Sequence, residues 1–471
     1  MQGSKSTATL PPKHDWSLPD RPGLVVEDEN EYARAADAGP VLAVEEAERY
    51  TEQLRKFTLE EVGSSSWFDQ HVNLLKLNIQ AHQSAMARSD EFVLEAMLTF
   101  DKVGVLVHEL LLIEVWKEMV LPHLLETERV RSGKCGLRLF FTINNEATLV
   151  NLLEVVLYHG HVLEEAGDAV VELVDYCARK VTMLNSSRKF AEPRPGHGSS
   201  ARQFAASLLS QGPKEQLQSR MDNVDFHVCV TAVTMLRYLC EHLHRLPLAA
   251  ASRMLDVHDV LLGLVPLVEN PPWTRRTPKG QWQKLIDFKW TDVPPTDLLK
   301  ITKTEAQVWI AMFHLMCQPE CRRRYHFNSF RKTSILRVRK YLNDVMLDQL
   351  PVLADVQRYM DELALMEVPE ASQAPAPAGL LMQQVPLVRE GLLGGGRDWA
   401  ALAAEQASGT FGENDDADDP DVRRVGAVYV DDSFQDILDP MGEGTGGVAG
   451  GGAGAGGGVA TAAAEVAPTH S

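Results

Sequence analysis

The sequence predicts an all-α protein, an irregular α-solenoid of armadillo- or HEAT-like helical hairpins, with disordered N- and C-terminal tails. Apolar residues recur at three- and four-residue spacing through most of residues 45–366, which places them along one face of each helix. Convincing strand patterns are scarce, and successive amphipathic hairpins must pack on their neighbours. No strict repeat is visible, so a compact irregular helical domain is the alternative.

One stretch, residues 144–184, carries the clearest helical pattern. Leu153 and Leu157 fall on one stripe of a first helix, and Leu173 belongs to a similar stripe on a second, because a helix turns once every 3.6 residues. The pattern predicts two helices joined by a tight turn. The preceding residues 137–143 contain β-favouring side chains. A lone strand would have no partner, so a helix or an extended connector is favoured there.

Composition divides the chain into four parts. Residues 1–44 form a predicted disordered leader. Residues 45–366 form the helical solenoid domain, interrupted by a mobile loop over 186–216 where the apolar period is lost. Residues 367–412 are a linker with a weak helix. Residues 413–471 form an acidic, then Gly/Ala-rich disordered tail, because so few apolar side chains cannot offset the entropy lost on ordering.

Two local signals refine the second half of the helical domain. Residues 269–295 combine three tryptophans with prolines and basic residues, which predicts a structured loop or insertion that packs against the body. A helix start follows. Thr302 with Glu305, or Thr304 with Gln307, has the spacing of a capping box.

The charge and cysteine content limit the classes of function. The formal net charge is −19 over 471 residues, which argues against nucleic-acid binding because a phosphate backbone would repel the protein. Six sparse cysteines indicate a reducing compartment rather than a disulfide framework. No apolar run reaches the roughly 18 residues of a membrane helix. We therefore expect a soluble cytoplasmic protein that binds no nucleic acid and does not insert into a membrane.

The sequence contains none of the common catalytic motifs, so we expect no enzyme, no catalytic residue and no cofactor. Cys317 and Cys321 are four residues apart, with His314 and His326 nearby. Pro319 lies between the cysteines and no second pair follows, so ordinary core cysteines are favoured over a metal site.

A cluster of basic residues stands out in this acidic chain, and we call it the basic patch. A solvated face that balances nearby acid is the favoured interpretation. The alternative is a docking patch for an acidic partner peptide or chaperone tail, with the acidic run 413–421 as an intramolecular competitor. The basic patch consists of Arg322, Arg323, Arg324, Arg331, Lys332, Arg337, Arg339 and Lys340.

Eight stretches share one property: in this order they match a known family, although each alone is unspecific. They are EVWKEMVLPHLLE (114–126), NNEATLVNLLEVVLYH (144–159), LVDYCARKVTML (173–184), MLRYL (235–239), SRMLDVHD (252–259), NPPWTRR (270–276), AQVWIAMFHL (306–315) and SFRKTSILRVRKYLNDVMLDQLPVLADVQ (329–357). Together they resemble the zinc finger MYND domain-containing protein 10 family, over about residues 50 to 366 and weakly to about 410.

The resemblance implies a function that the residues alone do not. Members of that family are assembly factors for axonemal dynein arms, so it implies a non-enzymatic adaptor or co-chaperone for cytoplasmic preassembly, needed for motile cilia or flagella. The implied partners are dynein heavy and intermediate chains, a leucine-rich-repeat assembly cofactor, and heat-shock chaperones with their co-chaperones. The implied location is the cytoplasm near basal bodies or centriolar satellites. A generic armadillo-like scaffold or transport adaptor unrelated to dynein is the alternative.

The sequence departs from that family's pattern in one respect. Family members typically end in a MYND finger, whose Cys and His side chains bind two zinc ions. Here no cysteine follows Cys321, and His470 is the only histidine in the tail. Because each structural zinc site needs about four such ligands, the sequence predicts no MYND finger and no bound zinc.

Overall fold

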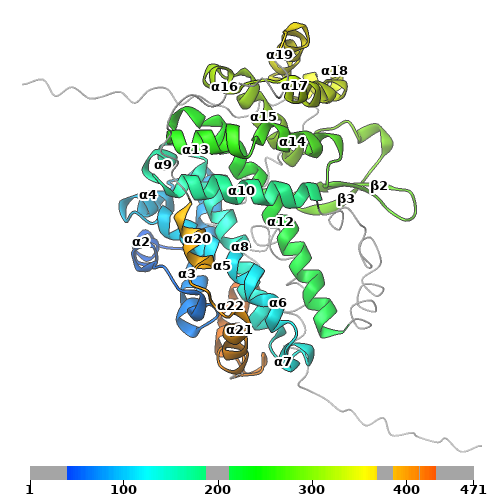
Figure 1. The fold of residues 1–471 in the computed structure, drawn as a ribbon. Coiled ribbons are helices and arrows are strands. Elements are labelled where there is room, and N and C mark those ends of the chain that lie inside the picture. Colours follow the sequence, from blue (N-terminus) through cyan, green and yellow to red (C-terminus); the bar gives the residue numbers. More distant parts are fainter. Residues whose placement is uncertain (1–39, 187–211, 369–385, 413, 431–471) are drawn as a thin grey trace, which may run out of the picture.

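The computed structural model describes four stretches of the chain, residues 40–186, 212–368, 386–412 and 414–430 (Figure 1). Within them the structure is mostly helical, with one small antiparallel sheet. The helical character is therefore confirmed, whereas the expectation of an all-α protein is corrected by the sheet. Most of the predicted leader, most of the predicted internal loop and the Gly/Ala-rich part of the tail lie outside the described residues.

Five long helices pack side by side in chain order (Figure 1). Each packs on the next because its apolar stripe is stable only when covered. The row fits a stack of helical hairpins, and an armadillo- or HEAT-like repeat stays an interpretation of it. The five helices are α3 (Ser65–Ala87), α8 (Gly136–Leu157), α12 (Pro213–Glu241), α15 (Lys303–Cys317) and α19 (Leu353–Leu365).

Helix α8 is the second helix of the row and is buried on nearly all sides. It includes residues 137–143, so the favoured helical interpretation of that stretch is correct. The short helix α9 (Gly160–Glu165) and the long helix α10 (Ala169–Ser186) follow. The two helices predicted over residues 144–184 are therefore confirmed, but the short helix α9 joins them instead of a tight turn.

The remaining helices of the described residues up to 365 pack around this row, and most of them are shorter. Before α8 they are α2 (Val44–Gln53), η1 (Leu59–Glu61), α4 (Phe92–Thr99), α5 (Val103–Met119), α6 (Leu121–Leu124) and α7 (Glu128–Arg131). After α12 they are η3 (Leu243–Arg245), α13 (Leu248–Ser252), η4 (Arg253–Val257), α14 (Val260–Glu269), η5 (Pro295–Asp297), α16 (Pro319–Arg324), α17 (Ser329–Leu336), η6 (Arg337–Tyr341) and α18 (Asp344–Gln349).

A reciprocal capping box fixes the start of α15. The Thr302 amide donates to Glu305 Oε2 at 2.8 Å, and the Glu305 amide donates to Thr302 Oγ1 at 3.3 Å. These two bonds satisfy backbone donors that a helix start otherwise leaves unpaired. The first of the two predicted capping pairs is therefore the one that forms.

The tryptophan-rich stretch forms a three-stranded antiparallel sheet, with strands β1 (Thr274–Arg276), β2 (Trp282–Ile286) and β3 (Lys289–Val293) in the order β1-β2-β3. Asp287 and Phe288 form the turn between β2 and β3, both with positive φ, as a tight hairpin turn of this twist requires. The prediction of a structured insertion holds, but its strands were not predicted.

The sheet packs down on the helical row through its aromatic side chains. The Trp290 ring stacks on Phe226 of α12 with centroids 5.9 Å apart, and the Arg275 guanidinium covers the other side of Trp290 at 3.8 Å. The Phe288 ring meets His227 edge-on at 5.2 Å. These contacts confirm that the insertion packs against the body.

The chain after residue 385 returns to the N-terminal half of the row (Figure 1). Helix α20 (Leu387–Leu393) packs on α5, α21 (Trp399–Ser408) packs on α6, and α22 (Pro420–Val430) packs on α3 and α8. We call residues 386–430 the C-terminal strap. The prediction that residues 414–430 belong to a disordered tail is therefore wrong. The weak helix predicted within residues 367–412 corresponds to α20 and α21, which pack on the body.

Acidic side chains of the strap are paired with α8, which explains why an acidic segment can pack here. The Arg138 guanidinium donates to the carboxylates of Asp419 and Asp421, the latter at 3.1 Å. The Asp416 carboxylate accepts from the Leu137 and Arg138 amides at 2.7 and 3.1 Å, where the positive end of the α8 dipole favours a negative charge. Composition alone signalled disorder because it does not reveal these partners.

Uncharged contacts hold the rest of the strap. The Trp116 indole donates to Gln406 Oε1 and Gln406 Nε2 donates to the Leu59 carbonyl, both at 2.9 Å. Farther along, the Tyr429 ring stacks on Phe141 with centroids 5.5 Å apart. Because α21 and α22 of the strap are anchored in this way, the N-terminal and C-terminal parts of the body form one packed unit.

We expect Arg138→Ala to lower the free energy of unfolding by about 3–5 kcal/mol, because it leaves buried carboxylates of the strap without their guanidinium. Arg424→Ala is the control: Arg424 also pairs with Asp421, but its side chain is 48% exposed against 7% for Arg138. The control should cost about 0–1 kcal/mol. Urea unfolding measures both, and equal losses would contradict the assignment of Arg138 as the anchor of the strap.

A second buried charge lies deeper in α8. The Glu146 side chain is fully buried and accepts from Lys117 Nζ at 2.5 Å, Lys180 Nζ at 2.7 Å and the Tyr176 hydroxyl at 2.8 Å. Burial by itself would raise the pKa of Glu146, but the two lysines outweigh it and hold the pKa well below its usual range. Glu146 therefore joins α5, α8 and α10 through charge as well as packing.

We expect Glu146→Gln to lower the free energy of unfolding at pH 7 by about 3 kcal/mol, because two buried ammonium groups lose a shared carboxylate. The control is Glu118→Gln. Glu118 is 44% exposed and pairs with Arg389, so losing this pair should cost about 0–1 kcal/mol.

The pH dependence has a definite sign. Because the folded pKa of Glu146 is lowered, its contribution is complete above the usual glutamate pKa of about 4.3 and is lost as the pH falls toward the folded value. Between about pH 5 and about pH 3, which lie on either side of the usual glutamate pKa, the free energy of unfolding should therefore fall more for the wild type than for Glu146→Gln. Parallel pH profiles for the two proteins would contradict this role.

Candidate functional site: a pocket beside the sheet

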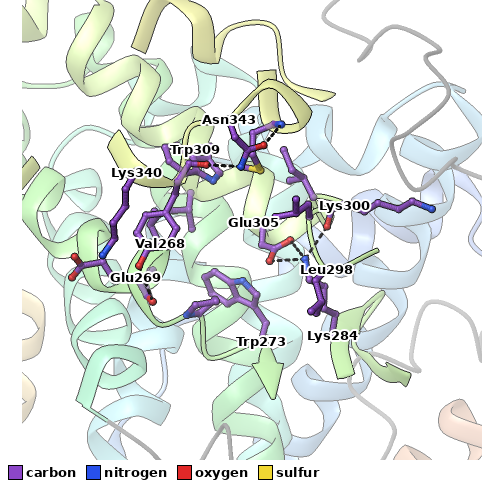
Figure 2. Close-up of a pocket in the computed structure, with 17 residues that line it drawn as sticks. Val268, Glu269, Trp273, Lys284, Leu298, Lys300, Glu305, Trp309, Lys340 and Asn343 are labelled. Atoms are coloured by element: carbon purple, nitrogen blue, oxygen red, sulfur yellow. Dashed lines mark hydrogen bonds and ion pairs between the residues drawn. The ribbon is translucent and has the colours of Figure 1, made fainter. Parts of the chain in front are cut away.

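A pocket of about 350 Å³ lies between the end of α14, the sheet, the start of α15 and the segment from η6 to α18 (Figure 2). Ligand pockets usually start at about 300 Å³, so this one suits a small group. Its walls are mostly apolar, with a few charged side chains around them. Residues far apart in sequence build it, including Leu267, Trp273, Leu299, Trp309 and Met346.

The charged floor of the pocket is internally neutralised. Lys284 Nζ lies 3.0 Å from both carboxylate oxygens of Glu305 and donates to the Lys300 carbonyl at 2.8 Å. Glu305 is held in turn by the capping box at Thr302. The same two residues that begin α15 therefore also position the floor, and Lys284 and Glu305 cancel each other's charge.

Trp273 brings an unsatisfied donor to the pocket wall. Its side chain is only 1% exposed, and its indole N–H has no hydrogen-bond acceptor among the described residues. Buried donors are nearly always paired, because an unpaired one costs about 1–3 kcal/mol. The indole N–H is thus an unpaired donor enclosed within the pocket wall and out of reach of solvent.

The rim of the pocket is exposed and carries one cation without an acidic partner. Leu299 is 51% exposed although it lines the cavity. The exposed Lys340 ammonium lies 4.9 Å from the Tyr341 ring and makes no salt bridge among the described residues. Glu269, which lies on the same side of the pocket as Lys340 in Figure 2, already pairs with Arg337 at 3.2 Å.

Lys340 is the one member of the basic patch that lines the pocket. Three other members make exposed ion pairs: Arg322 with Glu362 at 3.0 Å, Arg323 with Glu320 at 2.5 Å, and Arg339 with Asp361. Exposed pairs of this kind contribute about 0–1 kcal/mol, so they leave these side chains available at little cost. Arg324 is also exposed, at the end of α16.

Two members of the basic patch hold the local structure together instead. Arg331 Nε donates to Asp259 at 2.7 Å, and Lys332 Nζ donates to the Ala364 and Met366 carbonyls at 3.0 and 2.6 Å. Arg337, which pairs with Glu269, is itself 54% exposed and belongs with the exposed cations. The patch is therefore divided between structural and exposed cations, and partner binding by its exposed members stays a prediction.

The proposed internal competitor of the basic patch is placed elsewhere. Among the described residues of the acidic run, Asp416, Asp419 and Asp421 bind α8, and Asp415 pairs with Arg129 at 3.2 Å. Glu413 lies outside the described residues. The suggestion that this run occupies the basic patch is therefore wrong in this structure, because its carboxylates are already bound to the N-terminal half.

The cysteines do not resemble a zinc site. Burial raises the pKa of the Cys317 thiol to about 12 and that of Cys321 to about 11, whereas zinc binds the thiolate. No three metal-binding side chains lie close enough together among the described residues to hold a metal ion. The residues present there do not fit a zinc finger, so no chemistry is derived from a zinc ion.

The fold and the pocket define a largely helical protein with one small sheet and an apolar recess at its edge. Over 349 residues the chain is 30% identical to the zinc finger MYND domain-containing protein 10 homolog of Drosophila melanogaster, and the match covers 74% of this chain and 73% of that protein. The chain therefore belongs to the zinc finger MYND domain-containing protein 10 family. Neither a known family profile nor a solved structure matches it.

None of the helices in the described stretches is both long enough and apolar enough to cross a lipid bilayer.

Of the residues that line the pocket, only Lys340 belongs to a site that the sequence predicted. Trp273 lay in the stretch predicted to pack down, and Thr302 with Glu305 gave the capping signal, but neither pattern indicated a cavity. The pocket forms where four separate elements meet, and no local spacing in the sequence encodes that meeting.

We expect Arg331→Ala to lower the free energy of unfolding by about 1.5–3 kcal/mol, because its half-buried bond to the Asp259 carboxylate is charge-assisted. Arg323→Ala, whose side chain is 67% exposed, is the matched control and should cost about 0–1 kcal/mol. Urea unfolding of both variants separates structural from exposed members of the basic patch. A larger loss for Arg323→Ala would reverse that division.

Proposed function

We propose that this protein is a non-enzymatic adaptor or co-chaperone in the cytoplasmic preassembly of axonemal dynein arms, and that motile cilia or flagella require it. The observation that carries the proposal is membership of the family, through a match that spans 349 residues. The sequence resemblance that implies dynein arm assembly lies in the same helical body. Its eight stretches run from α5 to α19, so the proposal concerns the folded part of the chain.

The proposed partners are axonemal dynein heavy and intermediate chains, a leucine-rich-repeat assembly cofactor, and heat-shock chaperones with their co-chaperones. A row of helices supports such a role because it offers a long surface on which a client and a chaperone can lie together. The exposed arginines of the basic patch, Arg322, Arg323 and Arg324, are the proposed contact for acidic partner segments. The proposed location is the cytoplasm, near basal bodies or centriolar satellites.

The test is deletion of the gene in a flagellated or ciliated cell that carries it, with dynein arms scored by electron microscopy of axoneme cross-sections. We expect arms to be missing and motility to be lost, and re-expression of the wild-type chain to restore both. Normal arms with normal motility after deletion would contradict the proposal.

A pull-down with the full chain from the same cells distinguishes this proposal from an adaptor that serves other cargo. Recovery of dynein heavy and intermediate chains together with chaperones is the expected result. The triple variant Arg322→Glu, Arg323→Glu and Arg324→Glu should recover fewer acidic partners at low salt while melting normally. Recovery of transport cargo without any dynein chain would favour a different adaptor role.

A further inference from the structure

We propose that the pocket beside the sheet is a docking site for a partner polypeptide, and that it takes one large apolar side chain flanked by an acidic residue. The apolar side chain of that segment fills the recess, and its carboxylate pairs with Lys340. This inference goes beyond the proposed function, because it assigns a site and a ligand chemistry that adaptor activity alone does not require.

Size and lining favour an apolar side chain as the occupant. The cavity volume of about 350 Å³ is near the lower limit for ligand pockets, so it suits one bulky side chain rather than a nucleotide or a haem. Its walls include Leu267, Val308 and Trp309, all buried. Anchors of protein interfaces are typically bulky side chains that fill such desolvated pockets.

The charges around the pocket select against other ligands. Lys284 and Glu305 neutralise each other on the floor, so no free cation is present there to hold a phosphate. Lys340 on the rim has no acidic partner among the described residues, and it belongs to a face with several exposed arginines. One free cation beside an apolar recess is complementary to an apolar residue with a neighbouring carboxylate.

The rim shows that the site is open to a partner rather than closed over a small molecule. Leu299 lines the pocket yet is 51% exposed, and Val345, beside the lining residue Met346, is 44% exposed. Exposed apolar side chains around a recess are typical of a surface that another polypeptide covers. A buried cofactor would instead need these side chains to close over it.

The experiment measures binding of a fluorescein-labelled hexapeptide, Leu-Phe flanked on each side by two glutamates, to the full chain by fluorescence anisotropy. We expect saturable binding with a dissociation constant of about 10–100 µM, as for a single small contact. Replacing Leu-Phe by Ser-Ser, or the glutamates by lysines, should each weaken binding by about tenfold or more.

Protein variants locate the site. Leu299→Glu and Lys340→Glu should each weaken binding by about fivefold or more. Their controls are Leu248→Glu, at a leucine that is 54% exposed on α13, and Lys56→Glu at another exposed lysine. Both controls should bind like the wild type. Circular dichroism and melting temperature verify that all four variants fold.

Lack of saturable binding by the wild type, or binding that Leu299→Glu and Lys340→Glu leave unchanged, would overturn the proposal. The assay contains no dynein, so its failure leaves the adaptor function to be judged by the axonemes.

Discussion

The structure depends on burying charge inside its central helix. A helix that is covered on nearly all sides would ordinarily be apolar all round, yet α8 carries Arg138 and Glu146 in its buried faces. An unpaired charge in such a place costs several kcal/mol, so each neighbouring segment must bring the opposite charge. Lys117 of α5 and Lys180 of α10 pair with Glu146, and the C-terminal strap supplies the carboxylates that pair with Arg138.

That constraint explains how segments almost 300 residues apart come to lie together. Hydrophobic packing would accept many arrangements of amphipathic helices around α8, because apolar contacts are not directional. The carboxylates of Asp419 and Asp421 fit only where the Arg138 guanidinium points, which fixes α22 against α3 and α8. Charge pairing therefore selects one arrangement, while the apolar stripes supply most of the driving force. The elements that carry the basic patch and line the pocket, from α14 to α18, lie toward the opposite end of the helical row from the C-terminal strap (Figure 1).

The parts of the fold that the sequence predicted are those with local causes. The stripe through Leu153 and the capping pair Thr302–Glu305 lie within a few residues, so spacing alone reveals them. The sheet was missed because its longest strands have only five residues and lie among prolines and basic side chains. Residues 414–430 of the strap were predicted as disordered because their acidic side chains find their partner Arg138 only in three dimensions. The pocket was missed for the same reason.

Native-state hydrogen exchange of the full chain tests most directly whether α8 and its charge partners form the core on which the rest depends. The amides of residues 140–156 should exchange only through global unfolding, and those of residues 422–429 in α22 should be protected nearly as strongly. The amides of α19, at the far end of the row, should open at lower free energy. Fast exchange in α22 beside a protected α8, or an α8 that opens before α19, would contradict this account.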